Sequence, residues 1–366
     1  MINIPEIPLE NFQVPEDEVT SALGLINTYE GSLDFGVIGS GQAGCRIAKS
    51  FFDLGYQKSI AVNTSLSDLN PLEMPAEQKL RIGHLEGSGK SMEKGARAAQ
   101  ESSQQVFDKM RQVFGNVDKI IICVGFGGGT GAGSCPVLIS IATKYLDYLK
   151  HVNPAKDVIV IAALPTDGEL KSATIQVNNK KVQEDMFDIA DQGLIGPVIL
   201  IDNAKIEKLY RGIPPTKFWP SINDTITGLF QMFNYLSKQE SGYTTFDRED
   251  YKTVLTTPGL AVLGVTRVDL GKDEQLSQAL QDNLKKTLLA DMVDYTTAKE
   301  SACVVVAGTE VMDTISMDVI NYGFDTISNL IGNANVHRGL YDTDGDLIRA
   351  YTMITGCSPV ANKGKI

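Results

Sequence analysis

The chain has 366 residues, of which 43% are hydrophobic and 21% are charged, a balance typical of folded globular proteins. A chain of this length forms two or three domains. Acidic residues outnumber basic residues by 45 to 33, and the net charge of −12 at pH 7 repels phosphate backbones. We therefore expect no direct binding of nucleic acid. No apolar run approaches the roughly 20 residues that span a bilayer, so we expect no membrane partner.

The cysteines and histidines argue against folds held by disulfides or metals. The five cysteines are scattered and form no CxxC pair, which favours a reducing compartment over a disulfide framework. The three histidines lie far apart, so a histidine-rich metal site is not expected. The N-terminal stretch MINIPEIPLE has neither the basic residues nor the apolar run of a signal peptide. We expect a cytoplasmic protein.

Hydrophobic patterning divides the first part of the chain into alternating strands and helices. Residues 1–34 form an acidic N-terminal extension, in which Val19, Leu23 and Ile26 recur at the spacing of a short helix. Uniformly apolar runs then predict strands at residues 35–38, 59–62, 119–124, 158–164 and 198–201. Helical patterns lie at residues 42–54, 91–114 and 134–149. This alternation predicts an α/β fold, with a doubly wound parallel sheet of Rossmann-like type over residues 35–219.

A long helix and a smaller unit follow in the second part of the chain. Apolar residues from Ile222 to Leu236 recur at helical spacing and predict a long central helix after Pro220. Residues 220–258 comprise this helix and the polar loop 240–250 that ends it. Residues 259–356 are predicted to form a smaller α+β C-terminal domain, and residues 357–366 a short tail. Its expected elements are strands at 260–265 and 303–308, helices at 275–292 and beyond 308, and two final strands.

The turn between the two final strands imitates a calcium loop. Asp342, Asp344 and Asp346 have the right spacing, but Leu347 and Met353 replace the glycine and the glutamate that an EF-hand requires. We therefore expect a hairpin turn here.

The first glycine-rich loop, residues 39–44, has the pattern GxGxxG directly after a strand and at the start of a helix. Backbone N–H groups and the helix dipole make such a loop an anion site, and alone it would predict a dinucleotide-binding domain. An NAD-dependent oxidoreductase is thus one hypothesis. Asn63 and Thr64 end the second strand, where the ribose-binding acid of that fold should stand, and they count against it.

A second and richer glycine loop, residues 125–133, joins another buried strand to a helix. It has five glycines between residues 127 and 133, which let successive backbone amides converge on a triphosphate. The Thr130 hydroxyl is suited to a phosphate or a magnesium ion. The alternative is a tight turn without a ligand. A third segment, residues 83–91, nearly matches a P-loop but has His84 where the first glycine belongs. It either caps a terminal phosphate or forms a solvated turn.

Two of these loops carry a family resemblance. GGGTGAG at residues 127–133 resembles the tubulin signature GGGTGSG, and GQAGCRIA resembles the first tubulin loop. The resemblance to the tubulin/FtsZ superfamily covers residues 35–356. It implies a GTP-binding domain (35–219), a central helix with a catalytic loop (220–258) and a C-terminal activation domain (259–356). It also implies a magnesium-dependent GTPase that polymerises head to tail and hydrolyses GTP when the next subunit completes the site.

Several segments resemble the TubZ branch, the bacterial tubulins of plasmid and phage DNA segregation. They are residues 61–70, 164–171, 198–205 and 246–259. This branch implies a cytomotive filament and, as a second partner, a DNA-binding centromere adaptor protein. The alternative is an FtsZ-like division or cytoskeletal scaffold GTPase.

The resemblance also implies roles for individual residues. The residues expected around the phosphates are Gly41, Gln42, Gly87, Ser88, Gly89, Gly127, Gly128, Gly129, Thr130 and Gly131, with Gln42 and Thr130 also at the magnesium ion. Asn63 is also expected to bind the nucleotide. Asp167 and Lys171 are expected near the ribose. The residues expected at the guanine base are Asn203, Asn223 and Trp219, since an amide both donates and accepts and an indole stacks. The alternatives are that Asn223 caps its helix and Trp219 fills the core.

Asp247 and Asp250 are the candidate catalytic residues. FDREDYKTV resembles the family loop with an NxDxxD pattern, with Thr245 in place of the asparagine. Two carboxylates three residues apart can orient and polarise an attacking water. The resemblance puts them at the opposite end of the domain from their own nucleotide, so hydrolysis would depend on assembly. The alternative is a pair of solvated loop acids.

Overall fold

A computed structural model of the chain describes residues 30–84, 86–209, 214–268, 277, 287–345 and 348–360. The helix predicted around Val19 and most of the one predicted at residues 275–292 lie outside the described residues. Six strands form the N-terminal half of the sheet: β1 (Phe35–Ser40), β2 (Ser59–Asn63), β3 (Lys79–Arg81), β4 (Lys119–Gly125), β5 (Val158–Leu164) and β6 (Pro197–Asp202). All pair in parallel in the order β3-β2-β1-β4-β5-β6, which is the doubly wound order.

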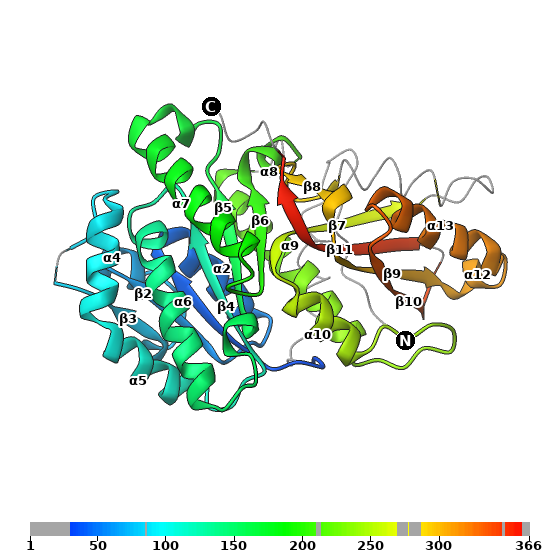
Figure 1. The fold of residues 1–366 in the computed structure, drawn as a ribbon, viewed down its shortest axis with the longest axis horizontal. Helices are drawn as coiled ribbons and strands as arrows, with labels where there is room; N and C mark the ends of the chain where they lie inside the picture. The colour runs from blue at the N-terminus through cyan, green and yellow to red at the C-terminus, as the bar shows by residue number, and fades with distance from the viewer. Residues whose placement is uncertain are drawn as a thin grey trace.

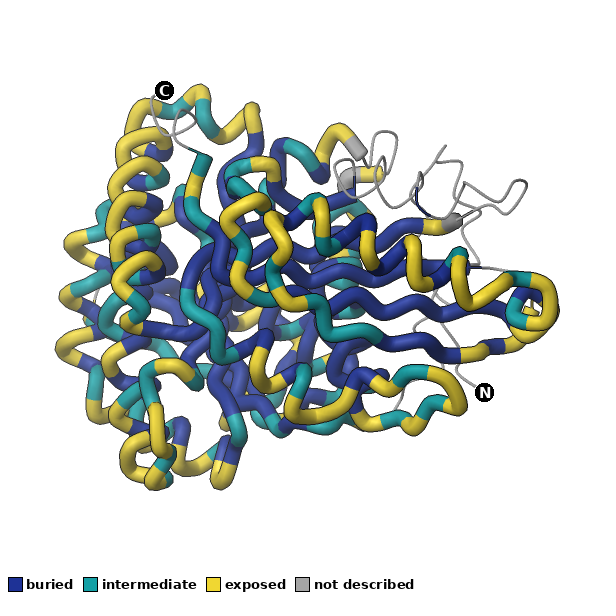
Figure 2. Tube along the Cα trace, turned by 45° about the vertical axis from the view of Figure 1, so that its right-hand side comes forward, coloured by how far each residue is buried: buried dark blue, intermediate teal, exposed yellow. Residues whose placement is uncertain are grey.

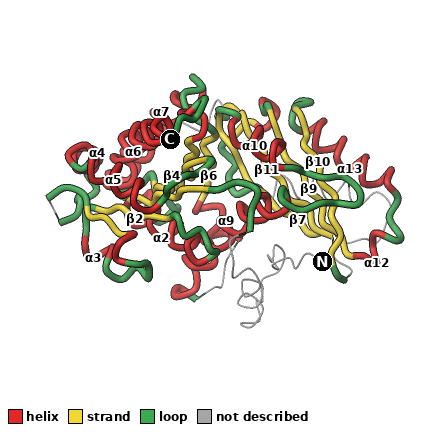
Figure 3. The backbone as a smooth tube through the Cα atoms, turned by 90° about the horizontal axis from the view of Figure 1, so that it is seen from below, coloured by secondary structure: helices red, strands yellow, loops and turns green. Residues whose placement is uncertain are grey.

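Helices cover both faces of this sheet (Figures 1 and 3). One face packs against α2 (Gly41–Asp53), α9 (Pro215–Leu236) and α10 (Arg248–Thr256). The other packs against α4 (Met92–Glu101), α5 (Ser103–Val113), α6 (Thr130–Tyr148) and α7 (Ala173–Asp191), and α13 (Met317–Leu330) covers the same face farther along, in the C-terminal half. Shorter helices are α3 (Leu66–Leu69), α8 (Asn203–Leu209) and α12 (Thr309–Met312). The predicted doubly wound α/β fold is confirmed. No helix in the described ranges has both the length and the apolar character to cross a membrane.

The sheet continues into the C-terminal half without a break. The strands there are β7 (Gly259–Val268), β8 (Val293–Asp294), β9 (Glu300–Gly308), β10 (Asn335–Thr343) and β11 (Ile348–Pro359). β7 pairs in parallel with β6, β11 lies antiparallel between β7 and β9, and β10 forms the outer edge. Figure 2 shows these strands as a buried layer under partly exposed helices. The domain boundaries drawn from the sequence stay a prediction.

The expected hairpin turn at Asp342–Asp346 is wrong. β10 and β11 are consecutive in the chain, yet β9 lies between them, parallel to β10 and antiparallel to β11. The two strands on either side of this turn are therefore not paired with each other. Turn residues predict that the chain reverses its direction, but they do not determine whether the two flanking strands pair with each other.

Other predicted elements also differ from the structure. The helix predicted at 91–114 is interrupted at Ser102, whose hydroxyl bonds Gly83 N. The helix α7 was not predicted at all. The central helix begins at Pro215, five residues before the expected start, because Pro at a first helical position needs no hydrogen-bond donor. The polar loop 240–250 ends in the first turn of α10.

Candidate functional site

A cavity of about 460 Å³ opens at the carboxyl ends of β1, β4 and β5. The strand order reverses between β1 and β4, so the cavity lies at the topological switch point, where doubly wound folds bind ligands. Three glycine-rich segments line it, together with the ends of β2 and β5 and one side of α9. We call this cavity the nucleotide pocket.

Two helices point their N-termini at this pocket. α2 begins at Gly41 and α6 at Thr130, and neither has a side-chain cap or an acidic residue in its first turn. Their first backbone N–H groups thus remain available, and the positive dipole ends favour an anion. Gly41 has φ +70, and a Cβ there would lie 2.8 Å from Gly131 N. The first and second glycine loops are therefore in backbone contact, which only glycine permits.

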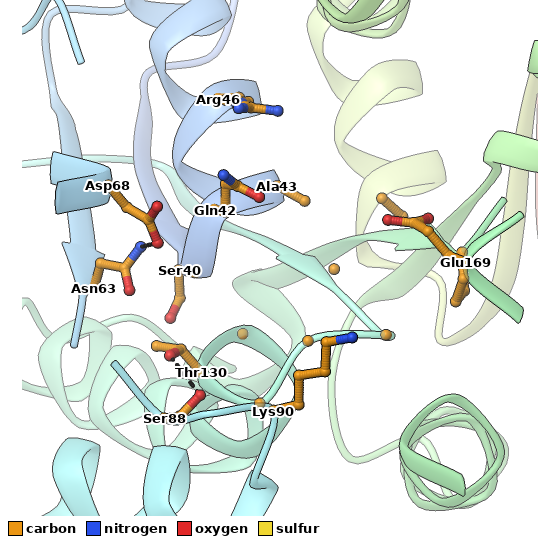
Figure 4. Close-up of a pocket in the computed structure, with 18 of the residues that line it drawn as sticks. Ser40, Gln42, Ala43, Arg46, Asn63, Asp68, Ser88, Lys90, Thr130 and Glu169 are labelled. Carbon is orange, nitrogen blue, oxygen red and sulfur yellow. Dashed lines mark hydrogen bonds between the residues drawn. The ribbon is translucent and has the colours of Figure 1, made fainter. Parts of the chain in front are cut away.

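The third segment closes the pocket from the β2 side. A Cβ on Gly129 would lie 2.4 Å from Ser88 Oγ and 2.6 Å from Ser91 N, so the segment passes directly over the second loop. The Thr130 hydroxyl donates to Ser88 Oγ at 3.1 Å and shares a hydrogen bond of 2.8 Å with Thr64. Lys90 has φ +64 and lines the pocket (Figure 4). The segment thus adds hydroxyl groups and a cation to the phosphate end.

Asn203, Trp219 and Asn223 line the other end of the pocket. Both asparagines are more than nine-tenths buried, and their side-chain amides make no hydrogen bond within the described residues. The polar atoms of these amides are not sealed in the core, so a polar ligand in the pocket can bond them. Asn223 lies more than two turns inside α9, so the alternative that it caps this helix is wrong. Trp219 packs edge-to-face on Phe218 with centroids 5.2 Å apart and also touches the core.

Two of the predicted nucleotide-binding residues do not line the pocket. Asp167 forms an exposed ion pair of 3.1 Å with Lys208, and Lys171 lies at the end of a short 3-10 helix. Glu169, between them, is the acid that lines the pocket. Its carboxylate accepts hydrogen bonds from Thr166 N at 2.8 Å and from the Thr166 hydroxyl at 3.2 Å.

The other predicted binding residues all line the pocket: Gly41, Gln42, Asn63, Gly87, Ser88, Gly89, Gly127, Gly128, Gly129, Thr130, Gly131, Asn203, Trp219 and Asn223. Sequence reasoning did not name Arg46, Asp68 or Glu169, which also line it, whereas Lys90 belongs to the segment expected either to cap a phosphate or to form a solvated turn. Asp68 accepts a hydrogen bond of 3.2 Å from Asn63 (Figure 4). Arg46 stands one helical turn after Gln42, and this i, i+4 spacing is a signal that could have found it.

The residues at the phosphate end also fit a magnesium ion. Within the described residues no group of three or more His, Cys, Asp or Glu side chains could hold a metal by itself. Magnesium is commonly held by one or two protein oxygens together with phosphates and water, and the Thr130 hydroxyl and the Gln42 amide oxygen supply such ligands.

Asp247 and Asp250 form the N-terminal cap of α10. Asp247 Oδ1 accepts hydrogen bonds from Glu249 N at 2.8 Å and Asp250 N at 2.9 Å, and Asp250 Oδ2 accepts one from Asp247 N at 3.1 Å. This reciprocal capping box fixes the relative position of the two carboxylates. Asp247 is exposed, and its Oδ2 makes no hydrogen bond within the described residues.

This pair lies near the amino-terminal ends of β1 and β4, whereas the nucleotide pocket lies at the carboxyl ends of these strands. Arg248, the first residue of α10, bonds Asp118 Oδ1 at 2.7 Å and the carbonyl of Ser32. Asp118 and Ser32 precede β4 and β1, whose carboxyl ends form the pocket. Strands of this length span roughly 20 Å at about 3.3 Å per residue, so Asp247 cannot reach the pocket of its own chain.

The fold and this site together define the class of α/β proteins that hold a phosphorylated nucleotide at a topological switch point. Residues 35–211 match the family model described as "Tubulin/FtsZ family, GTPase domain". Residues 35–211 are a GTPase domain of the tubulin/FtsZ family. The resemblance seen in the sequence is confirmed.

Named relatives come from several branches of this family. The chain is similar to tubulin-like protein CetZ of Pyrococcus horikoshii, with 28% identity over 334 residues that cover 87% of this chain and 84% of CetZ. It is 26% identical to tubulin-like protein TubZ of Bacillus cereus over 307 residues, 75% of this chain and 66% of TubZ. The crystal structure of a GTPγS-form protofilament of Bacillus thuringiensis serovar israelensis TubZ has a TM-score of 0.78 at 18% identity, over 94% of this chain and 92% of that chain.

Proposed function

We propose that this protein hydrolyses GTP and assembles head to tail into filaments, in which Asp247 and Asp250 of one subunit complete the nucleotide pocket of the next. One observation carries the proposal: the pocket lies at the carboxyl ends of the strands, and the two carboxylates lie at their amino-terminal ends. A stack of subunits brings these two halves together. The GTPγS-form TubZ protofilament supports the same arrangement through its shared fold.

The base end of the pocket is suited to guanine. Asn203 and Asn223 offer a donor and an acceptor each, which match the mixed edge of that base. Trp219 supplies an aromatic face for stacking. Both amides line the pocket and make no hydrogen bond within the described residues, which supports their use on a ligand.

The phosphate end is suited to a nucleoside triphosphate. The N-termini of α2 and α6 and the amides of Gly127–Gly131 surround the phosphates, and Lys90 and Arg46 add positive charge. Magnesium, held by Gln42 and Thr130, supplies charge neutralisation on the phosphates when bound.

The trans-acting carboxylates position the water that attacks the γ-phosphorus. Asp247 Oδ2 accepts a hydrogen bond from this water and receives its proton as the new P–O bond forms. The bond between the γ-phosphorus and the bridging oxygen breaks, and GDP leaves with the electron pair. Asp250 holds Asp247 through its hydrogen bond to the Asp247 amide.

The decisive experiment follows GTP turnover per subunit as the protein concentration rises, with light scattering recorded in parallel. We expect turnover to rise steeply at the concentration where scattering appears. Constant turnover per subunit across that range, including concentrations without filaments, would falsify the proposal.

For the cellular role we infer the segregation or positioning of plasmid or phage DNA in the cytoplasm. The TubZ-like segments at 61–70 and 198–205 support it, and the net charge of −12 requires a separate DNA-binding adaptor. Filaments sedimented with DNA test this: DNA should pellet only when a basic DNA-binding protein encoded beside the gene is added. DNA that never pellets with that protein present contradicts the role.

A division or cytoskeletal scaffold role of the FtsZ kind is the second candidate. Relatives from two branches match this chain: the CetZ match covers 87% of it and the TubZ match 75%. These matches therefore do not select one cellular role. Fluorescent fusions separate the two roles, because a segregation filament follows DNA foci and a scaffold follows the cell envelope or division plane.

A further inference from the structure

His337 on β10 joins the candidate catalytic turn to the neighbouring strand. Its Nδ1 lies 2.7 Å from Asp250 Oδ1, and its Nε2 lies 3.0 Å from Glu300 Oε2 on β9. The imidazole is only 18% exposed, and Asp250 and Glu300 are 32% and 17% exposed. We call these three side chains the His337 clamp.

The clamp fixes the second oxygen of Asp250. Asp250 Oδ2 already accepts the Asp247 amide, so both Asp250 oxygens are held, one by the candidate catalytic residue and one by His337. On the other side, Glu300 Oε1 accepts a hydrogen bond of 3.0 Å from Asn335. The position of Asp247 therefore depends on a chain of contacts that runs through α10, β10 and β9.

The geometry of the clamp selects one protonation state. A neutral imidazole donates from one nitrogen only, whereas the imidazolium donates from both. Each ring nitrogen of His337 faces a carboxylate oxygen, so both hydrogen bonds form together only when the ring is an imidazolium. Loss of the proton turns one contact into a repulsion between two lone pairs.

The other charged groups near the clamp are committed elsewhere. On α10, Arg248 pairs with Asp118 and Lys252 pairs with Glu249. Arg338, next on β10, pairs with Asp325. Tyr341 shares the strand face of His337, and burial raises its pKa to about 12, so it stays neutral near neutral pH. Within the described residues, Asp250 and Glu300 are the carboxylates that bond the ring.

We propose that His337 is a positioning residue of the filament GTPase, and that its imidazolium form holds the Asp247–Asp250 turn in its hydrolysing geometry. This inference rests on the proposed function. It makes GTP turnover within the filament depend on the protonation of the His337 ring. Assembly itself does not need the clamp.

The main test compares wild-type protein with His337→Gln, which cannot donate to both carboxylates. Filaments are assembled with GTP, and turnover per assembled subunit is measured between about pH 6 and about pH 8. We expect wild-type turnover to fall roughly fivefold across this range, and the variant to be slow and independent of pH. Equal pH profiles for the two proteins overturn the proposal.

Matched variants exclude a merely structural effect. His151 has the same 18% exposure and also faces an aspartate, Asp157, at 2.8 Å, but it does not touch Asp250. His151→Gln should keep the wild-type pH profile. Glu300→Gln keeps the imidazole in place and removes one counter-charge, so the fall in turnover should begin at lower pH. A wild-type profile for Glu300→Gln contradicts the clamp.

A spectroscopic test separates this inference from the proposed function. The chain has three histidines, so the ring ¹⁵N signals of labelled protein are few, and His337→Gln identifies the signal of interest. At about pH 6 we expect both His337 nitrogens to carry a proton. A single protonated nitrogen overturns the clamp, whatever the GTPase data show. If Asp247→Ala keeps full turnover, the proposed function fails while the protonation result stands.

Discussion

The Arg248 guanidinium lies 2.7 Å from the Asp118 carboxylate, and this ion pair ties the first turn of α10 to the residue before β4. Both side chains are partly exposed, so the pair adds at most about 1 kcal/mol to stability. Its importance is positional. It holds the candidate catalytic turn near the amino-terminal end of β4, away from the chain's own nucleotide pocket at the carboxyl end.

Two substitutions of Asp247 separate its cap from its chemistry. Asparagine caps a helix about as well as aspartate, whereas alanine loses roughly 1 kcal/mol. We expect Asp247→Asn to fold with wild-type stability, to assemble with GTP and to hydrolyse it at least about a hundredfold more slowly. Asp247→Ala should show the same loss of turnover with a lower unfolding midpoint in urea.

The measurements are phosphate release and light scattering on the same samples. Filaments of either variant should persist after the wild-type filaments have disassembled. Rapid disassembly of Asp247→Asn filaments with wild-type phosphate release would remove Asp247 from the mechanism.

Gly129→Ala tests the contact between the second glycine loop and the segment above it. The new Cβ would lie 2.6 Å from Ser91 N, so backbone must move and the phosphate end must open. We expect affinity for GTP to fall at least about tenfold, since a displaced loop loses several phosphate hydrogen bonds. Equilibrium binding of a fluorescent GTP analogue measures this.

Gly228→Ala is the matched control for that substitution. Gly228 lies within α9, and a Cβ there meets nothing within 4 Å. Alanine should stabilise this helix by up to about 1 kcal/mol and leave GTP affinity unchanged. Equal affinities for the Gly129 and Gly228 variants would contradict the steric argument.

The single tryptophan gives a direct readout of the base end. Trp219 is the only tryptophan of the chain and lines the pocket, so a stacked base should quench its fluorescence. We expect GTP and GDP to quench the emission in a saturable manner and ATP to have little effect. Asn223→Ala should weaken the GTP effect at least about tenfold, through the lost amide contacts. Equal quenching by ATP and GTP would exclude guanine selectivity at this site.

The phosphate-binding part of the pocket could be predicted because its residues are contiguous in the chain. Gly127–Gly131 and Gly41–Gln42 each fall at one junction where a strand passes into a helix, and this junction fixes their position. The acid near Asp167 could not be chosen in the same way. Which of Asp167 and Glu169 faces the pocket depends on the 3-10 turn that follows, and no pattern in the sequence specifies that turn.

Contacts between segments that are distant in the chain also could not be predicted from the sequence. His337 and Asp250 are 87 residues apart, and the strand order that brings them together is not encoded locally. The same is true of β9, which lies between β10 and β11 where a hairpin was expected. Local patterns predict elements, while pairing across the sheet depends on the packing of the whole chain.

The five buried cysteines predict a loss of stability in mild alkali. Burial raises the pKa of four thiols from 9.0 to about 12: Cys45, Cys135, Cys303 and Cys357. It shifts the pKa of Cys123 in the same direction. In the unfolded chain these thiols ionise near pH 9, so above that pH the unfolded state binds fewer protons than the folded state. Stability present below pH 9 is therefore lost as the pH rises toward about 12.

Reversible urea unfolding in a reducing buffer at about pH 8 and about pH 9.5 measures this effect, below the midpoint at which ordinary tyrosines ionise. Each thiol should contribute roughly 1 kcal/mol to the fall in unfolding free energy between the two pH values. In a Cys45→Ala variant this fall should be smaller by the contribution of one thiol. Lys119 acts in the opposite direction, because burial lowers its pKa, but one group does not offset five. An unfolding free energy that stays constant or rises over this interval would contradict burial of the thiols.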